Sequence, residues 1–165
     1  MIRFEVIDAT FNLRHKNAIK NWIKEIILRK NRVPGSINYI FASDGYVLDV
    51  NRKYLGHDYF TDIITFDTSA YDYELPVHLR NDRLSADIVI SLDTVLANAC
   101  EYSTGFSDEL YRVMAHGILH LLGYDDRAEH DAVRMREGEE QALSLATEMG
   151  LPFDQIFINS PGNEK

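Results

Sequence analysis

The sequence predicts an α+β fold in which a small mixed β-sheet of about four strands packs against five or so helices. Short apolar or alternating segments stand among longer ones whose apolar residues recur every three or four positions. After residue 91 only the longer, helical segments occur, so strands and helices do not alternate along the whole chain. At 165 residues and 45% hydrophobic, without a repeat or linker, the chain is expected to form a single domain over residues 1–165, with a polar tail at about 159–165.

Four segments have the composition and length of β-strands. The first alternates apolar and polar residues, which predicts one buried face. The second follows Pro34 and Gly35, which are expected to break the preceding helix. The last is nearly all apolar between polar ends, as is typical of a central strand buried on both faces. The predicted strands are residues 2–7, 37–42, 61–66 and 87–91.

Five segments are predicted to be helical. In the first, isoleucine and tryptophan side chains form one apolar stripe. Asp44 is the expected cap of the second helix and Gly56 its end, and Ser107 is the expected cap of the fourth. The segment at 69–85 lacks periodicity and is predicted to be a long loop. The predicted helices are residues 17–30, 44–54, 91–102, 107–122 and 128–149.

Two sets of charged side chains lie along predicted helices. Lys16, Lys20 and Lys24 are four residues apart and form either a solvated face or a phosphate-contacting face, with nothing in the spacing to decide. The acids of the last helix are interpreted as a solvated face. They are Glu137, Glu139 and Glu140.

The composition restricts the class of protein. Cys100 is the single cysteine, which excludes an internal disulfide and fits a reducing compartment. We see no signal peptide at the N-terminus and no run of about 18 apolar residues, so we expect a cytoplasmic protein without a membrane partner. The net charge is −9, which disfavours a general nucleic-acid binder. Residues 1–35, however, hold eight of the 17 basic residues and only three of the 26 acids, a polarity that could orient a polyanion.

The segment at 114–126, MAHGILHLLGYDD, is the most informative stretch. His116 and His120 lie four residues apart in a predicted helix, so both imidazoles leave the same face and can share one divalent ion. Gly123 can end the helix, and the turn after it brings acidic side chains beside the helix end. A third ligand from this turn would leave a position open for water, as in catalytic metal sites. The other interpretation is a pair of satisfied core histidines.

Three residues compete for the place of third ligand. Asp126 lies just past the turn, Asp125 is its neighbour and His130 begins the next helix. We favour Asp126 because it lies nearest the helix end. A two-histidine, one-carboxylate set is compatible with zinc, iron or manganese. Gly117 stands where HExxH metalloproteases carry their glutamate base, which argues against a peptidase.

A second polar group lies between the second predicted helix and the third strand. Such loops often hold substrate groups, although a capped turn is an equally good interpretation. Its members are Asn51, Arg52, Lys53, His57, Asp58, Thr61 and Asp62.

Three stretches together resemble the YbeY family of metal-dependent endoribonucleases. HGILHLLGYDD is similar to the family signature HGxLHLxGYDH, NRKYLGHDYFTDIITF to N-x-x-Y-R-G-x-D-x-x-T-D-V-L-S-F, and SADIVIS to G-D-I-x-I-S. The resemblance covers about residues 51–143. It implies an α+β fold, one divalent ion, most simply Zn²⁺, and work on small-subunit ribosomal RNA.

The resemblance places His116 and His120 on the first two family ligands and Asp126 on the third, where the family has histidine. Leu55 stands where the family has an arginine, a natural phosphate contact, and Arg52 or Lys53 would have to substitute. We therefore expect His116, His120 and Asp126 as metal ligands, with the two histidines and Arg52 as catalytic residues.

The resulting hypothesis is a single-strand-specific, metal-dependent endoribonuclease in maturation of small-subunit ribosomal RNA and ribosome quality control. Its expected partners are ribosomal RNA, the small ribosomal subunit and ribosome-associated proteins. The alternative is a ribosome-assembly binding factor with a structural metal and little or no nuclease activity, which Leu55 favours. A hydrolase of another substrate, such as an ester, is a third interpretation.

Overall fold

A four-stranded mixed sheet forms the centre of the molecule in the computed structural model, which describes residues 1–71, 76 and 82–158. The strand order is β1-β2-β4-β3. β1 and β4 both run parallel to β2, and β3 pairs with β4 in the antiparallel direction. The strands are β1 (Ile2–Ile7), β2 (Val33–Ala42), β3 (Ile63–Asp67) and β4 (Arg83–Ser91). β4 is therefore an inner strand, as its apolar composition predicts.

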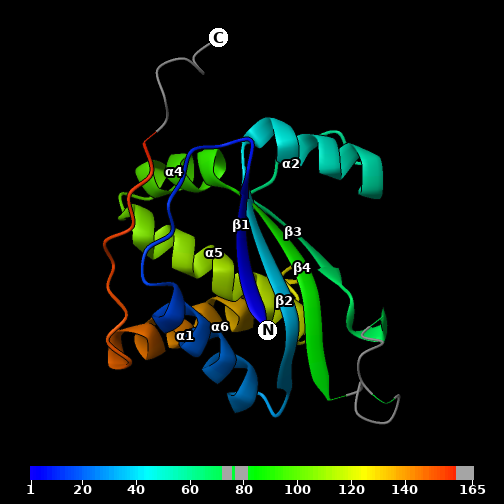
Figure 1. Ribbon diagram of the computed structural model, residues 1–165, viewed down its shortest axis with the longest axis vertical. Coiled ribbons are helices and arrows are strands. Elements are labelled where there is room, and N and C mark those ends of the chain that lie inside the picture. The colour runs from blue at the N-terminus through cyan, green and yellow to red at the C-terminus, as the bar shows by residue number, and fades with distance from the viewer. Residues whose placement is uncertain (72–75, 77–81, 159–165) are drawn as a thin grey trace.

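The helices lie on both faces of this sheet. α1, α5 and α6 gather on one face (Figure 1) and share the main core with side chains such as Tyr39, Ile88 and Ile90. Val89 points the other way and packs with α2, because side chains alternate along a strand. The helices are α1 (Lys16–Arg29), α2 (Asp44–Val50), α4 (Leu92–Glu101), α5 (Phe106–Leu121) and α6 (Glu129–Glu148), with shorter turns η1 (Asn51–Leu55) and η2 (Ser69–Tyr71).

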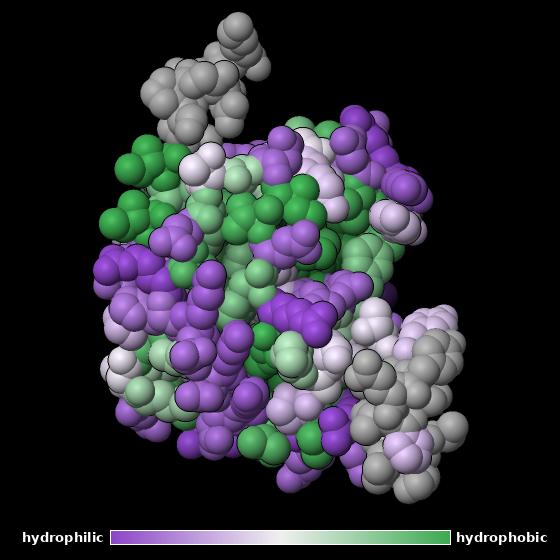
Figure 2. All heavy atoms as spheres, in the orientation of Figure 1, coloured by the Kyte–Doolittle hydropathy of each residue, from purple (hydrophilic) through white to green (hydrophobic). Residues whose placement is uncertain are grey.

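Polar atoms in the core are hydrogen-bonded. Trp22 Nε1 donates to the carbonyl of Ala142 at 2.8 Å, and the Tyr39 hydroxyl donates to the carbonyl of Met114 at 3.0 Å. These bonds join α1 to α6 and β2 to α5, so they fix α5 between the sheet and the outer helices. Hydrophilic side chains of α1 face outward in the view of Figure 2, while its isoleucine and tryptophan stripe is buried as predicted.

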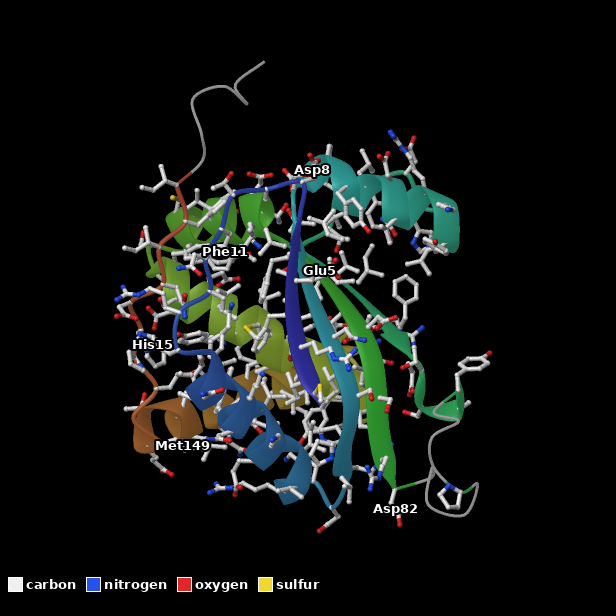
Figure 3. The ribbon with its side chains drawn as sticks, viewed as in Figure 1. Glu5, Asp8, Phe11, His15, Asp82 and Met149 are labelled. Atoms are coloured by element: carbon white, nitrogen blue, oxygen red, sulfur yellow. The ribbon has the colours of Figure 1, made fainter. Side chains whose placement is uncertain are left out.

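The chain before α1 meets the chain after α6. His15, labelled in Figure 3, lies 2.8 Å from Asp154 through its Nε2 atom, and Gln155 Nε2 donates to the carbonyl of Arg14. The predicted tail at 159–165 lies outside the described residues. No helix in the described ranges is long and apolar enough to cross a bilayer.

The break expected at Pro34 and Gly35 is wrong. α1 ends at Arg29, and both residues lie inside β2, where the register with β4 shifts between Pro34 and Ile37. The irregularity explains how a proline is accommodated. Gly35 is needed there because a β-carbon would stand 2.3 Å from Ser85 Oγ.

Two predicted helix caps are also wrong. Ser43, rather than Asp44, caps α2, since its side chain accepts a hydrogen bond from the Tyr46 amide. Gly105 occupies the cap position of α5, and Ser107 lies inside the helix, where its hydroxyl accepts from the Gln155 amide at 2.7 Å. Tertiary contact thus decides the role of Ser107.

The segments on either side of β3 differ in part from their predictions. The second predicted helix continues as η1 to Leu55 and ends at Gly56, whose φ of 66° is left-handed as expected. The loop predicted at 69–85 begins with η2, and its last residues belong to β4. Residues 72–75 and 77–81 of this loop lie outside the described residues.

Candidate active site

α5 brings the histidine pair to the wall of a cavity. Gly117, between them, faces the sheet so closely that a β-carbon would meet Ile63 Cδ1 at 2.7 Å and Thr65 Cγ2 at 3.3 Å. This close approach places the adjacent His116 beside β3. The cavity has a volume of about 590 Å³. It is lined by Asn51, Leu55, His57, Tyr59, Thr61, Asp62, Ile63, Ile64, Thr65, His116, His120, Asp125, Asp126 and Arg127.

The Nδ1 atoms of both histidines are held by hydrogen-bond acceptors. His116 Nδ1 lies 2.9 Å from Glu139 Oε2, and His120 Nδ1 lies 3.2 Å from the carbonyl oxygen of Tyr124. A carboxylate and a carbonyl accept hydrogen bonds, so each neutral ring carries its hydrogen on Nδ1. Both Nε2 atoms then keep a free lone pair, which is the state of a metal-binding histidine.

The carboxylate that orients His116 comes from α6. The interpretation of Glu139 as part of a solvated face is wrong, because its side chain is only 12% exposed and also accepts from Arg112 Nη1 at 3.3 Å. Glu140 lies outside this contact and bonds to Arg112 Nη2. The hydrogen bond to Glu139 raises the pKa of His116 above its ordinary value, against the opposing effect of burial.

The turn after α5 places the three candidate third ligands differently. Gly123 adopts a φ of 104°, which permits the sharp turn. Asp126 Oδ2 lies 3.6 Å from His116 Nε2, and its carboxylate lines the cavity. Asp125 is engaged by Arg127 and by backbone amides, and these bonds lower its pKa. His130 is 87% exposed, pairs with Asp131 and does not line the cavity.

The two imidazoles and the carboxylate at this site are chemically suited to bind a divalent ion. Imidazole Nε2 atoms and a carboxylate are ligands that zinc accepts. The described part of the chain nevertheless contains no ready-made cluster of three His, Cys, Asp or Glu side chains that could hold an ion. The structure brings His116 and Asp126 together, whereas assignment of all three residues as ligands stays a prediction.

The second polar group is divided by the fold. Asn51, His57, Thr61 and Asp62 line the same cavity as the histidines, and the other three members do not. Arg52 forms ion pairs with Asp58 and Asp49 at the surface. Burial raises the pKa of the Asp62 carboxyl, while the charge of nearby His116 opposes the shift.

Comparison with known proteins identifies the family. The family described as "Endoribonuclease YbeY" matches residues 4–147. The chain belongs to the YbeY family. It is 40% identical over 145 residues to the Endoribonuclease YbeY of Flavobacterium psychrophilum, covering 88% of this chain and 96% of that protein. It is 44% identical over 130 residues to the Endoribonuclease YbeY of Bacteroides thetaiotaomicron, covering 79% and 88%.

A solved structure carries the same fold. The solution structure of a Thermotoga maritima protein superposes with a TM-score of 0.58, at 22% identity and over 100% of both chains. The predicted α+β fold and the YbeY resemblance are thus both confirmed.

Among the charged and aromatic side chains at the site, three were not predicted from the sequence. Arg127 and Tyr59 line the cavity, and Glu139 orients His116. No local spacing could have singled out Glu139, because its partner lies 23 residues away. Tyr59 did carry a signal, because the adjacent aromatic residues Tyr59 and Phe60 are unusual in a turn, where glycine, proline, asparagine, aspartate and serine predominate. Leu55, at the position of the YbeY arginine, also lines the cavity.

Proposed function

We infer that this YbeY-family chain is a metal-dependent endoribonuclease that cuts single-stranded RNA during ribosomal RNA maturation and ribosome quality control. The observation that carries the inference is the pair His116 and His120 at one cavity wall, each with Nδ1 bonded and Nε2 available. Relatives named Endoribonuclease YbeY support RNA as the substrate.

We propose that His116, His120 and Asp126 hold one divalent ion, most simply Zn²⁺. Asp126 is preferred over the two other candidates because Asp125 is bound to Arg127 and His130 lies outside the cavity. Such an ion would lower the pKa of a bound water toward about 7 and polarise the scissile phosphate. Glu139 would keep the His116 ring oriented with Nε2 toward the ion.

Basic and acidic side chains around the cavity have separate roles in this proposal. Arg127 lines the cavity and can offset phosphate charge there, and Arg52 can do so at the surface if it exchanges its acidic partners for RNA. The cavity lining includes none of Lys16, Lys20 and Lys24. The Asp62 carboxyl lines the cavity and burial raises its pKa, so we propose it as the group that accepts a proton from the attacking group.

The proposal also specifies the binding partners and the cellular compartment. Maturation of ribosomal RNA would place the chain on the small ribosomal subunit, with ribosome-associated proteins, in the cytoplasm. The single, exposed Cys100 fits a reducing compartment.

Metal content is the direct test of the ligand set. Elemental analysis compares wild type with Asp126→Ala, both purified without a histidine tag. Near-stoichiometric metal in wild type that is lost in the variant supports the proposal. Metal retained by Asp126→Ala would move the third ligand to Asp125 or His130, and metal absent from both proteins would contradict a metal-dependent enzyme.

The alternative of a ribosome-assembly factor with a structural metal makes a different prediction. Chelation would lower the melting temperature and weaken ribosome association, yet the purified protein would never cut RNA. No contact in the described residues favours this alternative over the nuclease.

A further inference from the structure

Three exposed aromatic side chains occur close together in the sequence, in η1 and in the loop that joins it to β3. Tyr54, Tyr59 and Phe60 are 61%, 56% and 62% exposed, within a span of seven residues. Exposure of several large aromatic rings to water is energetically unfavourable. A patch of such rings on a protein surface is typical of a binding site. Tyr59 and its neighbour His57 also line the cavity that contains His116 and His120.

The ring of Tyr59 is held in a defined orientation. It stacks on the His57 ring with centroids 5.1 Å apart and planes 19° apart, and its hydroxyl lies 2.9 Å from His57 Nδ1. The backbone beneath is fixed by Asn51, which is 1% exposed, since its Nδ2 donates to the Tyr59 carbonyl at 2.9 Å. The His57 amide donates to the Asn51 carbonyl at 3.2 Å. The two rings therefore form a platform that is organised before any ligand binds.

We propose that Tyr59, stacked on His57, is a base-stacking platform that receives one unpaired base of the RNA substrate beside the histidine pair. The inference rests on the proposed function and adds a recognition element to it. Unpaired bases stack on aromatic rings without regard to sequence, whereas bases inside a duplex have no free face to offer. The platform thus gives a physical reason for single-strand preference.

The surroundings of the platform favour a nucleotide over a lipid or protein surface. The cavity volume of about 590 Å³ falls within the ~300–1,000 Å³ typical of small-ligand sites. Arg127 on its wall can meet the phosphate that follows a stacked base if it exchanges Asp125 for that phosphate. An aromatic ring and a cationic side chain in one cavity are the combination that binds single-stranded nucleic acid.

The test compares two probes with the same phosphates. Fluorescence anisotropy in a chelator, which prevents cleavage, measures binding of an oligoadenylate of about 12 nucleotides and of an abasic oligomer of equal length. Tyr59→Leu is expected to weaken oligoadenylate binding about tenfold, toward the lower end of the range for one stacked base, and to leave abasic binding unchanged. Tyr59→Phe keeps the ring and is expected to bind both probes like wild type.

Tyr102→Leu is the matched control, because Tyr102 is 65% exposed and lines no part of the cavity. The proposal is overturned if Tyr59→Leu binds oligoadenylate like wild type, if it loses both probes equally, or if wild type does not distinguish the probes. The last result would assign the aromatic cluster to another partner. RNA cleavage by metal-loaded wild type, measured in parallel, keeps these outcomes separate from a failure of the proposed nuclease function.

Discussion

The tautomer of His116 is set by one side chain from a different helix. Glu139 reaches across from α6 and holds Nδ1, while Arg112 holds Glu139. The sequence predicts the two histidines from their spacing, because helix geometry makes residues four apart neighbours. It cannot predict Glu139, which is one of several acids along α6 and differs from them only in what packs beside it.

Glu139→Gln is expected to lower zinc affinity about 10- to 100-fold, the usual effect of losing a carboxylate that orients a histidine ligand. The amide carries no charge to stabilise the Nδ1–H form of His116. Competition with a chelating indicator measures the affinity, and nitrogen chemical shifts of His116 in the metal-free protein report the tautomer.

Glu140→Gln is the control for this substitution, since Glu140 bonds to the same Arg112 but not to His116. An equal loss of affinity in Glu140→Gln would mean that the arginine network, rather than the histidine contact, carries the effect. Unchanged affinity and tautomer in Glu139→Gln would contradict the orienting role.

Glu109 is expected to make the stability of the fold depend on pH. It is 5% exposed, and burial raises its carboxyl pKa above the ordinary value. The folded state then binds the proton more tightly than the unfolded state, so the contribution to stability is present below a pH of about 4 and is lost as pH rises through the raised pKa. Glu109→Gln removes the charge and is expected to be more stable than wild type at neutral pH.

Melting temperatures measured from about pH 4 to pH 8 check this sign. The advantage of Glu109→Gln over wild type should grow with pH, while Glu148→Gln, at an exposed position of α6, should show no such trend. An advantage that shrinks as pH rises would refute the assignment.

At the scale of secondary-structure elements, the close packing of α5 against the sheet depends on Gly117. A methyl group there would stand 2.7 Å from Ile63 Cδ1. Because that atom is the mobile end of a side chain, the overpacking in Gly117→Ala is expected to cost about 1 kcal/mol, which cancels the ~0.5–1 kcal/mol that alanine gains over glycine in a helix. Chemical denaturation measures the free energy of unfolding.

Gly45→Ala provides the comparison, because a β-carbon at Gly45 in α2 meets nothing closer than Ser43 Oγ at 4.0 Å. There the alanine is expected to stabilise by about 0.5–1 kcal/mol through helix propensity. A Gly117→Ala protein stabilised as much as Gly45→Ala would show that α5 does not need the close approach.

Periodicity alone predicts the elements of this fold to within a few residues, since strands and helices bury faces with different repeats. Residues 2–7 form the predicted strand without change, and α1, α4 and α6 differ from expectation by one residue at each end. The errors fall where a tertiary contact overrides a local preference. Pro34 is accommodated by a register shift against β4, and Ser107 is engaged by Gln155 instead of capping α5.

At the scale of the whole molecule, the cavity joins segments that are more than 50 residues apart. η1 and the loop that follows it bring Asn51, His57 and Asp62 to the histidines of α5. The sequence indicates that these polar residues belong together, but it does not distinguish a substrate-binding loop from a capped turn. That distinction depends on the packing of α5 against β3. The same packing leaves Arg52 at the surface and places Arg127 at the cavity.

RNA cleavage by the purified protein tests the central claim most directly. The measurement uses a single-stranded RNA labelled at one end, with wild type and His116→Ala each assayed as purified, after chelation and after zinc is restored. Wild type is expected to cleave the RNA internally, chelation to abolish this cleavage and zinc to restore it, and His116→Ala to cleave under no condition. Cleavage that persists in a metal-free His116→Ala protein would contradict a metal-dependent endoribonuclease.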